Sequence, residues 1–409
     1  MDPYSTEFQA DPHPFYAALR AAAPVYKVPG HDFYLVVTAE LVRQAVRDPQ
    51  AFSNEVTAVR RTSPPAELAA ELSAVRAQGL AYQPTLSLND PPRHTRFRKL
   101  VQRAFTPRAL TWMDPVVTEL SRELVAALPA DDPLDIVDAL ARPLPIYAIC
   151  RILGLPNSWR DDITTWSDAA TAALGSSHLE RERWLDVEYR MLDLQRALVP
   201  EFARRRAAPT DDLLSVLVAP DPEHGALTDA ELIWLVRELL VAGNETTTKT
   251  ITDLILRLDG RPREWQRVRD DPQRATAVVE ECLRLASPVQ GMFRRVTRPI
   301  TLGGVDLPEG THVFLAFGSA NRDETVFPAP DEFDPDRPNV RSHLAFGQGI
   351  HACLGNALAR MEATTVLREL AGTVARIDVL DPAAVRYTRS FVLRGIRELP
   401  VRVRRRTPS

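Results

Sequence analysis

One cysteine lies in a stretch whose composition suits metal coordination. Residues 346–355 read Phe-Gly-Gln-Gly-Ile-His-Ala-Cys-Leu-Gly and include Cys353. The three glycines allow positive φ angles and a close approach of the backbone to a flat ligand. An amphipathic pattern follows, so Cys353 lies near a helix N-terminus, where unpaired N–H groups favour an anionic sulfur. A thiolate suits a haem iron, although a lone cysteine is more often a buried structural residue.

A second stretch is polar where the surrounding pattern is an apolar helix. Residues 242–248 read Ala-Gly-Asn-Glu-Thr-Thr-Thr and follow Leu239-Leu240-Val241. Glycine costs a helix interior about 1 kcal/mol relative to alanine, and threonine hydroxyls can bond to the carbonyl four residues earlier and bend the helix. Such a local conflict often marks a functional site. A packing glycine with threonines against a neighbouring helix explains it equally well, so both interpretations stay open.

Two pairs of charged residues have helical spacing. Glu281 and Arg284 are three apart, and His94 and Arg98 are four apart, so each pair lies on one helix face. By itself such a pair is usually solvated and contributes little. The other cysteines, Cys150 and Cys282, form no CxxC or CxxCH motif and are predicted to be packing residues.

The elements that must position these residues are mostly helices. A capping-box pattern at Thr228–Glu231 predicts the start of a helix that runs to about residue 258. Further helices are predicted over about 273–286 and 354–372, and the segment 87–207 is mostly helical. Short strands are expected at 33–37, and at 300–302 and 313–316 on either side of a Gly303-Gly304 turn. The pattern predicts a mainly α (α+β) protein with small peripheral sheets.

Composition and charge narrow the function class. The chain has 409 residues, 45% hydrophobic and 25% charged, which is typical of a globular protein. A net charge of −4 argues against nucleic-acid binding. Residues 1–9 are polar, and no run of about 18 apolar residues occurs, so we expect a cytoplasmic protein that does not contact a membrane.

Taken in order, these motifs resemble those of the cytochrome P450 family. Residues 346–355 match its cysteine-ligand pattern Phe-x-x-Gly-x-His-x-Cys-x-Gly at every fixed position, and residues 242–246 match Ala-Gly-x-acid-Thr. Glu281-x-x-Arg284 precedes a Phe-Asp-x-x-Arg segment that ends at Arg337, and residues 90–98 match Asp-Pro-Pro-x-His-x-x-x-Arg. The resemblance covers nearly the whole chain. It implies a single domain over 1–409 with haem between the long helix and the cysteine loop, as in a soluble bacterial member.

The resemblance implies a role for each motif residue. Cys353 is expected to be the axial ligand of haem b, with Phe346, Gly347 and Gly349 shaping its loop. Gly243 is expected to make room for dioxygen, Thr246 to donate a hydrogen bond during oxygen activation, and Glu245 to supply protons where many members carry Asp. The propionates are expected to contact His94, Arg98, Arg294 and His351. Glu281, Arg284 and Arg337 are expected to form a structural network.

The implied activity is a monooxygenase of bacterial secondary metabolism that hydroxylates or epoxidises a terpenoid, steroid, fatty acid or polyketide. The expected distal wall includes the loop before Leu88, residues 169–185, and Leu86, Leu240, Ala242, Val289, Phe293, Phe391 and Val392. No flavin- or nicotinamide-binding motif occurs. Electrons are therefore expected from NAD(P)H through a ferredoxin reductase and a ferredoxin, which would dock on a monomer near Arg98, Arg103, Arg341 and Arg360.

Three alternatives remain open. A haem-thiolate sensor or carrier would have no need of the Glu245–Thr246 pair. A peroxide-driven peroxygenase or isomerase on the same scaffold commonly lacks that pair. An unrelated α-helical binding protein would require four motifs to coincide in order.

Overall fold

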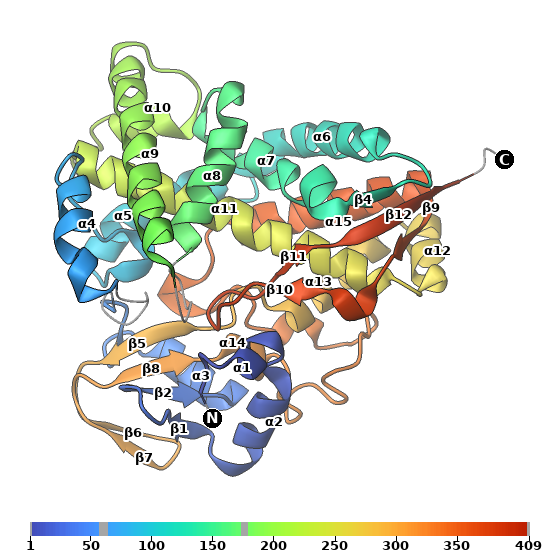
Figure 1. Cartoon of the computed structure of the whole chain (residues 1–409), viewed down its shortest axis with the longest axis horizontal. Helices are drawn as coiled ribbons and strands as arrows, with labels where there is room; N and C mark the ends of the chain where they lie inside the picture. The colour runs from blue at the N-terminus through green and yellow to red at the C-terminus, as the bar shows by residue number, and fades with distance from the viewer. Residues whose placement is uncertain (1, 57–63, 173–178, 407–409) are drawn as a thin grey trace.

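Helices make up most of the structure, a computed structural model that describes residues 2–56, 64–172 and 179–406 (Figure 1). The described helices are α1 (Thr6–Ala10), α2 (His13–Ala22), α3 (Ala39–Arg47), α4 (Ala69–Arg76), α5 (Arg93–Gln102), α6 (Met113–Ala127), α7 (Pro143–Leu153), α8 (Arg160–Thr171), α9 (Arg181–Ala207), α10 (Leu213–Val218), α11 (Asp229–Leu258), α12 (Pro262–Asp270), α13 (Arg274–Ala286), α14 (Phe317–Ala320) and α15 (Asn356–Thr373). No helix in these ranges is long and apolar enough to cross a membrane.

Helix α11 is the central element of the helical part. It begins with the predicted capping box, in which Thr228 and Glu231 satisfy each other's backbone N–H groups. It contacts α7, α8, α9, α13 and α15, and most of its second half is buried. The largest hydrophobic cluster of the described chain surrounds it. This long helix, visible through the middle of Figure 1, therefore connects many parts of the helical layer.

A five-stranded sheet packs with α1, α2 and α3 at the edge of the helical part (Figure 1). Its strand order is β1 (Val25–Lys27), β2 (Phe33–Val36), β8 (His312–Leu315), β5 (Met292–Val296) and β3 (Phe52–Ser53). Strands β2 and β8 are parallel, and the other pairs are antiparallel. The antiparallel register pairs Met292 with Leu315 and Arg294 with Val313, which fixes the face on which each β5 side chain lies.

The remaining strands form small sheets. Strands β4 (Pro133–Asp135), β12 (Pro400–Arg405) and β9 (Val374–Val379) make one, and β10 (Arg386–Tyr387) pairs with β11 (Ile396–Glu398). Strands β6 (Ile300–Leu302) and β7 (Val305–Leu307) form a hairpin. The predicted strands and the Gly303-Gly304 turn between them are present, but β7, which directly follows the turn, was not predicted. The turn leads into β7, because two glycines at positive φ close a tight hairpin, and β8 belongs to the larger sheet.

Candidate active site

A cavity of about 690 Å³ lies between the middle of α11 and the segment that precedes α15. Its wall includes Gly243, Glu245 and Thr246 from α11, and it also includes Cys353. The two stretches that stood out in the sequence therefore face one enclosed space, although about a hundred residues separate them in the chain.

The loop before α15 presents Cys353 to this cavity. The backbone N–H of Cys353 donates to the Phe346 carbonyl over 2.8 Å, which closes the loop. Gly347 and Gly349 have φ angles of +63° and +76°, which L residues rarely adopt. A Cβ on Gly349 would lie 2.7 Å from the carbonyl oxygen of Val46. Phe346 and Gly347 line the cavity, whereas Gly349 instead packs the loop against α3.

The Cys353 thiol is enclosed but faces positive charge. Burial raises its pKa, while a hydrogen bond from the Gly355 backbone and the charges of Arg98 and Arg360 lower it. A bound metal cation would lower the pKa of the thiol further, because coordination deprotonates a thiol.

Two arginines and two histidines line one cavity. His94 and Arg98 come from α5, Arg294 from β5 and His351 from the cysteine loop, and all four line the same space. The two imidazole rings lie 4.1 Å apart between centroids, and Arg98 donates to the Ala352 carbonyl over 2.7 Å. The structure thus brings the four predicted residues together.

The positive charge of this group comes from Arg98 and Arg294, and it acts on the buried His351. Burial, together with the charges of His94, Arg294 and Arg98, lowers the pKa of His351 to about 3. Its buried Nε2 atom has no hydrogen-bond partner among the described residues. Two carboxylates would supply the missing acceptors and relieve the repulsion. The cluster and the cysteine thus fit a haem, whose propionates would lie at the rim and whose iron would bind the thiolate.

The polar middle of α11 remains continuous helix. Thr246 donates its hydroxyl to the Ala242 carbonyl over 3.0 Å, and Thr250 donates to the Thr246 carbonyl over 2.9 Å. This is the predicted bonding to the carbonyl four residues earlier. A Cβ on Gly243 would lie 3.2 Å from Ile149 of α7. Gly243 therefore also allows α7 to approach α11, besides lining the cavity.

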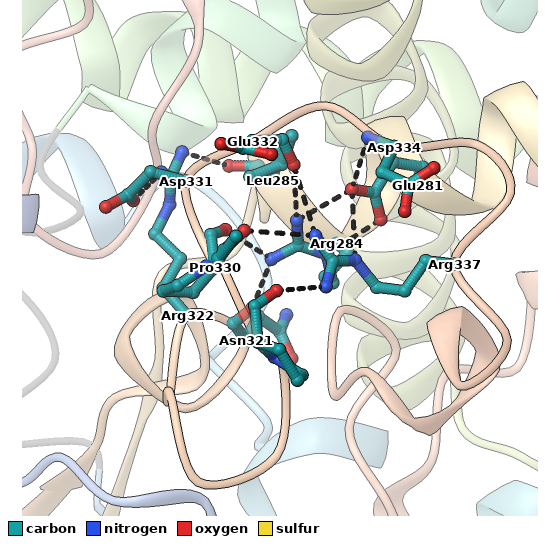
Figure 2. Close-up of polar contacts among 12 residues, drawn as sticks. Glu281, Arg284, Leu285, Asn321, Arg322, Pro330, Asp331, Glu332, Asp334 and Arg337 are labelled. Carbon is teal, nitrogen blue, oxygen red and sulfur yellow. Dashed lines mark hydrogen bonds and ion pairs between the residues drawn. The ribbon is translucent and has the colours of Figure 1, made fainter.

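The network predicted from Glu281, Arg284 and Arg337 is present, and Figure 2 shows it. Arg284 donates to both carboxylate oxygens of Glu281 over 2.8 and 2.7 Å, and both side chains are fully buried. Arg337 approaches the same carboxylate at 3.4 Å. Arg284 also donates to the carbonyls of Asn321, Pro330 and Glu332. The network ties α13 to the irregular segment that leads to the cysteine loop.

The sequence did not reveal a neighbouring network that supports the same loop. Glu280 accepts from His343 over 3.0 Å and from Arg360 over 2.5 Å, and its pKa falls to about 2 despite burial. The guanidinium of Arg360 lies 4.4 Å above the Phe346 ring. In the sequence, Glu280 stands out only as the residue before Glu281. Its partners lie 63 and 80 residues away, and residue spacing does not predict contacts over such separations.

This network corrects part of the proposed docking surface. Arg360 is engaged with Glu280 and Phe346, and Arg98 faces the cavity, so neither is an exposed docking group. Arg103 and Arg341 are exposed.

Four of the residues expected in the distal wall line the cavity, namely Leu86, Ala242, Val289 and Val392. The other three do not line it: Leu240, Phe293 and Phe391. Leu240 lies about 200° around α11 from Ala242, since each residue advances about 100°, and it is buried in the core while Leu239 and Val241 line the cavity. Phe293 follows the strand alternation, so Met292 and Arg294 face the cavity and Phe293 points the other way.

Phe391 joins Phe293 in an aromatic cluster beneath the sheet. The two rings lie 6.0 Å apart between centroids, and Phe33 and Phe314 complete the cluster. Of the predicted wall segment 169–185, Ala170 and Thr171 line the cavity, and residues 173–178 lie outside the described residues.

Several polar side chains of the wall are already partnered. Glu238 of α11 accepts from the Thr85 hydroxyl and from the Ser87 backbone over 2.9 Å. Glu188 pairs with Arg76, and Gln195 accepts from the Leu80 backbone over 2.7 Å. These bonds hold the segment 76–88 against α9 and α11, so it closes the cavity.

Two further residues near the cavity escaped the sequence-based prediction. Glu362 of α15 lines the cavity, and burial raises its pKa to about 8, so its carboxyl group is mostly protonated at neutral pH. Lys249 forms an ion pair with Glu245 one turn along α11. The i, i+4 spacing of Glu245 and Lys249 was a readable signal for this pair.

The other two cysteines are packing residues, as predicted. Cys150 and Cys282 are fully buried in the main hydrophobic cluster. Burial raises the pKa of Cys150 to about 11 and raises that of Cys282 as well, so both remain thiols.

Comparisons with known proteins agree with this site. The cytochrome P450 family profile matches residues 195–370. The chain is 35% identical to vitamin D(3) 25-hydroxylase of Pseudonocardia autotrophica, over 98% of this chain and 96% of that protein. It is 34% identical to 6-deoxyerythronolide B hydroxylase of Saccharopolyspora erythraea, over 98% of each.

Solved structures show the same fold. Cytochrome P450 CREJ in complex with (4-ethylphenyl) dihydrogen phosphate superposes with a TM-score of 0.90 at 30% identity, over 98% of each chain. CYP109E1 of Bacillus megaterium in complex with testosterone gives a TM-score of 0.82 at 32% identity, over 97% of each chain. This chain belongs to the cytochrome P450 family of haem-dependent monooxygenases.

Proposed function

We propose that this protein hydroxylates or epoxidises a hydrophobic small molecule such as a terpenoid, steroid, fatty acid or polyketide. The reaction consumes the substrate, dioxygen, two electrons and two protons, and it releases the oxygenated product and water. Haem b would supply dioxygen binding and O–O cleavage. The observation that carries the proposal is that Cys353, Thr246 and the cluster of two arginines and two histidines all line one cavity.

The chain's own residues hold the cofactor in this proposal. Cys353 provides the thiolate, and His94, Arg98, Arg294 and His351 bind the two propionates. Phe346 and Gly347 line the cavity beside Cys353 and would contact the cofactor, and Gly349 keeps the loop in place. The Glu281 network keeps the preceding segment rigid, so the sulfur stays at a fixed position.

Protons reach the distal side through α11 in this proposal. The Thr246 hydroxyl lines the cavity and donates to the Ala242 carbonyl, so a small rotation redirects it into the cavity. Glu245 is the next ionisable group and supplies the proton that Thr246 passes on. Positioned acid groups of this kind typically accelerate proton transfer 10²–10⁴-fold.

The apolar part of the wall favours a hydrophobic substrate. Leu86, Val241, Val289, Met292 and Val392 line the cavity. Burying a cationic substrate group would be costly without a free carboxylate, and Glu188 and Glu238 are already bonded to Arg76, Thr85 and Ser87. The names of the relatives, vitamin D(3) 25-hydroxylase and 6-deoxyerythronolide B hydroxylase, support the steroid and polyketide classes.

Electrons would come from NAD(P)H through a ferredoxin reductase and a ferredoxin. The exposed Arg103 and Arg341 would attract an acidic partner to a monomeric, single-domain chain. Electron-transfer rates should then fall as salt increases, because salt screens surface charges.

The absorption spectrum of the reduced protein with carbon monoxide tests cofactor ligation. A strongly red-shifted Soret band is expected for a thiolate ligand, and Cys353→Ser should abolish it. Loss of the red shift in the wild-type protein would refute the ligand assignment.

Thr246→Ala tests the activity. With a substrate identified by Soret-shift titration of steroids and macrolactones, the variant should still consume NAD(P)H and dioxygen but form less product and more hydrogen peroxide. Equal coupling in both proteins would contradict the relay. Ligand binding without turnover would favour a sensor, and turnover with hydrogen peroxide alone would favour a peroxygenase.

A further inference from the structure

Arg360 of α15 is connected to the cysteine ligand by two separate routes. Its guanidinium lies 4.4 Å from the centroid of the Phe346 ring, and the Phe346 carbonyl accepts the Cys353 N–H over 2.8 Å. Arg360 also donates to the side-chain oxygen of Asn356 over 3.0 Å, and the Asn356 amide donates to the Cys353 carbonyl over 2.7 Å. Both backbone groups of Cys353, the N–H and the C=O, are therefore linked to Arg360 through one intervening residue.

Glu280 of α13 holds the guanidinium in this place. Its carboxylate accepts from Nε of Arg360 over 2.5 Å and from Nη2 over 3.3 Å. Despite burial, the pKa of Glu280 is lowered to about 2 by the bonds from His343 and Arg360, so the carboxylate is charged. Nδ1 of His343 accepts the Ala345 N–H over 3.2 Å, so the ring proton lies on Nε2, which donates to Glu280 over 3.0 Å. The imidazole is thus neutral, and the network contains one negative and one positive charge.

The two charges act in opposite directions on an electron added to the site. Arg360 is close enough for its charge to act on the Cys353 sulfur. A cation beside a metal–thiolate unit favours the reduced form, because reduction adds one negative charge, and an anion favours the oxidised form. Net charge and hydrogen bonding around the sulfur are among the features by which a protein sets a reduction potential. The Glu280–Arg360 pair supplies both signs of charge behind one ligand.

We infer that Arg360 is a positioning residue that sets the reduction potential of the haem iron, with Glu280 and Asn356 holding its positive charge beside the cysteine loop. The inference rests on the proposed ligation of haem by Cys353. Reduction adds one electron to the iron, supplied by the ferredoxin, and the thiolate remains the ligand. Arg360 favours the ferrous form and Glu280 opposes it, so the pair controls how readily the first electron is accepted.

Substitutions in the pair should therefore shift the potential in opposite directions. Arg360→Met removes the positive charge but keeps a long side chain over Phe346, so the potential should fall. Glu280→Gln removes the negative charge but keeps the shape of the side chain, so the potential should rise. A purely structural pair would give shifts of the same sign, since either change loosens the same loop. Arg360→Lys keeps the charge and should stay close to the wild type.

Redox titration of the substrate-free holoenzyme with dithionite and mediator dyes, followed by the Soret band, is the assay. A nearby charge typically changes such an equilibrium about tenfold or more. At a fixed applied potential, the ratio of ferrous to ferric protein should fall about tenfold in Arg360→Met and rise about tenfold in Glu280→Gln, which corresponds to shifts of about 59 mV for a one-electron couple. The double variant with both substitutions should return the ratio to within about twofold of the wild type, because it removes both charges.

Two neighbouring charges on α15 provide matched controls. Arg368 and Glu369 lie about two turns further along the helix than Arg360. Arg368 donates to the Pro272 carbonyl over 2.9 Å, and Glu369 pairs with Arg122 at 3.5 Å. Arg368→Met and Glu369→Gln remove the same kinds of charge away from the cysteine loop, so each should change the ratio by less than about twofold.

Any pattern other than a fall in Arg360→Met and a rise in Glu280→Gln would overturn the inference. The reduced carbon monoxide spectrum and thermal unfolding show whether each variant is folded and keeps the thiolate ligand. If Arg360→Met does not bind haem, the direction of the shift in Glu280→Gln decides the question. A wild-type protein without the red-shifted band would instead refute the ligation by Cys353, which is a failure of the proposed function and not of the charge pair.

Discussion

The fully buried ion pair between Glu281 and Arg284 allows a quantitative stability prediction. We consider Arg284→Met, which keeps a long side chain but removes every donor. The substitution leaves Glu281 charged at 0% exposure, with the Asp334 backbone at 3.0 Å and Arg337 at 3.4 Å as its remaining partners. It also removes the Arg284 donor from the Asn321 and Pro330 carbonyls, whereas the Glu332 carbonyl keeps Arg337 as a donor.

The magnitude follows from these losses. Breaking a buried ion pair by removing one partner typically costs 3–5 kcal/mol, and each buried carbonyl left without a donor costs about 1–3 kcal/mol. Rearrangement and water entry offset part of this sum. We therefore expect Arg284→Met to lower the apparent free energy of unfolding by at least about 3 kcal/mol. Arg284→Lys should recover only part of the loss, because an ammonium group has three donors and cannot form the guanidinium fork.

Guanidinium chloride unfolding of the haem-loaded protein, followed by far-UV circular dichroism, is the assay. The fraction of protein with the red-shifted carbon monoxide band should fall in parallel, since the network supports the segment that carries Cys353. Arg196→Met is the control. Arg196 also pairs with a carboxylate three residues away, Asp193, but the side chains are 62% and 46% exposed, so about 0–1 kcal/mol is expected. A loss below about 1 kcal/mol in Arg284→Met would refute the reasoning.

Three further predictions concern the site. Gly349→Ala should lose haem and the red-shifted band, because the residue has a φ of +76° and its new Cβ would lie 2.7 Å from the Val46 carbonyl oxygen. Gly304→Ala is the control. Gly304 has a φ of +79° but lies in open space, so this variant should lose only about 1–2 kcal/mol of stability. In the apoprotein the pKa of His351 is lowered to about 3 from 6.5. Below pH 6.5 the unfolded chain therefore binds a proton that the folded chain does not, so the melting temperature of the apoprotein should fall between pH 6.5 and 3. His351→Phe should make the melting temperature less dependent on pH over this range. Val392→Phe should weaken Soret-shift binding of large substrates more than that of small ones, because Val392 lines the cavity, and equal weakening would contradict its place on the wall.

The sequence alone determined the features that depend on short segments. The spacing in residues 346–355 identified Cys353 and the glycines with positive φ, because a ligand loop needs particular residues at fixed offsets. The capping box at Thr228 predicted the first turn of α11, since its hydrogen bonds span three residues. The pairing of Glu281 with Arg284 was likewise readable from their spacing.

Only the tertiary structure decided which side of an element faces the cavity. Leu240 and Ala242 are two residues apart in α11, but about 200° of rotation separates them. Phe293 and Arg294 are adjacent in β5, and strand alternation sends them to opposite faces. The sequence specifies the helical and strand periodicities, but it does not specify which side of each element faces the cavity. Packing against α7, α8 and β8 decides that.

The long-range charge pairs also required the structure. Glu280 meets His343 and Arg360 across gaps of 63 and 80 residues. Because charges of both signs are distributed along the whole chain, residue spacing does not predict which charged residues pair at such separations. Burial determines the pairs, because a charge removed from water is tolerated only where the fold places a counter-charge or hydrogen-bond partners beside it.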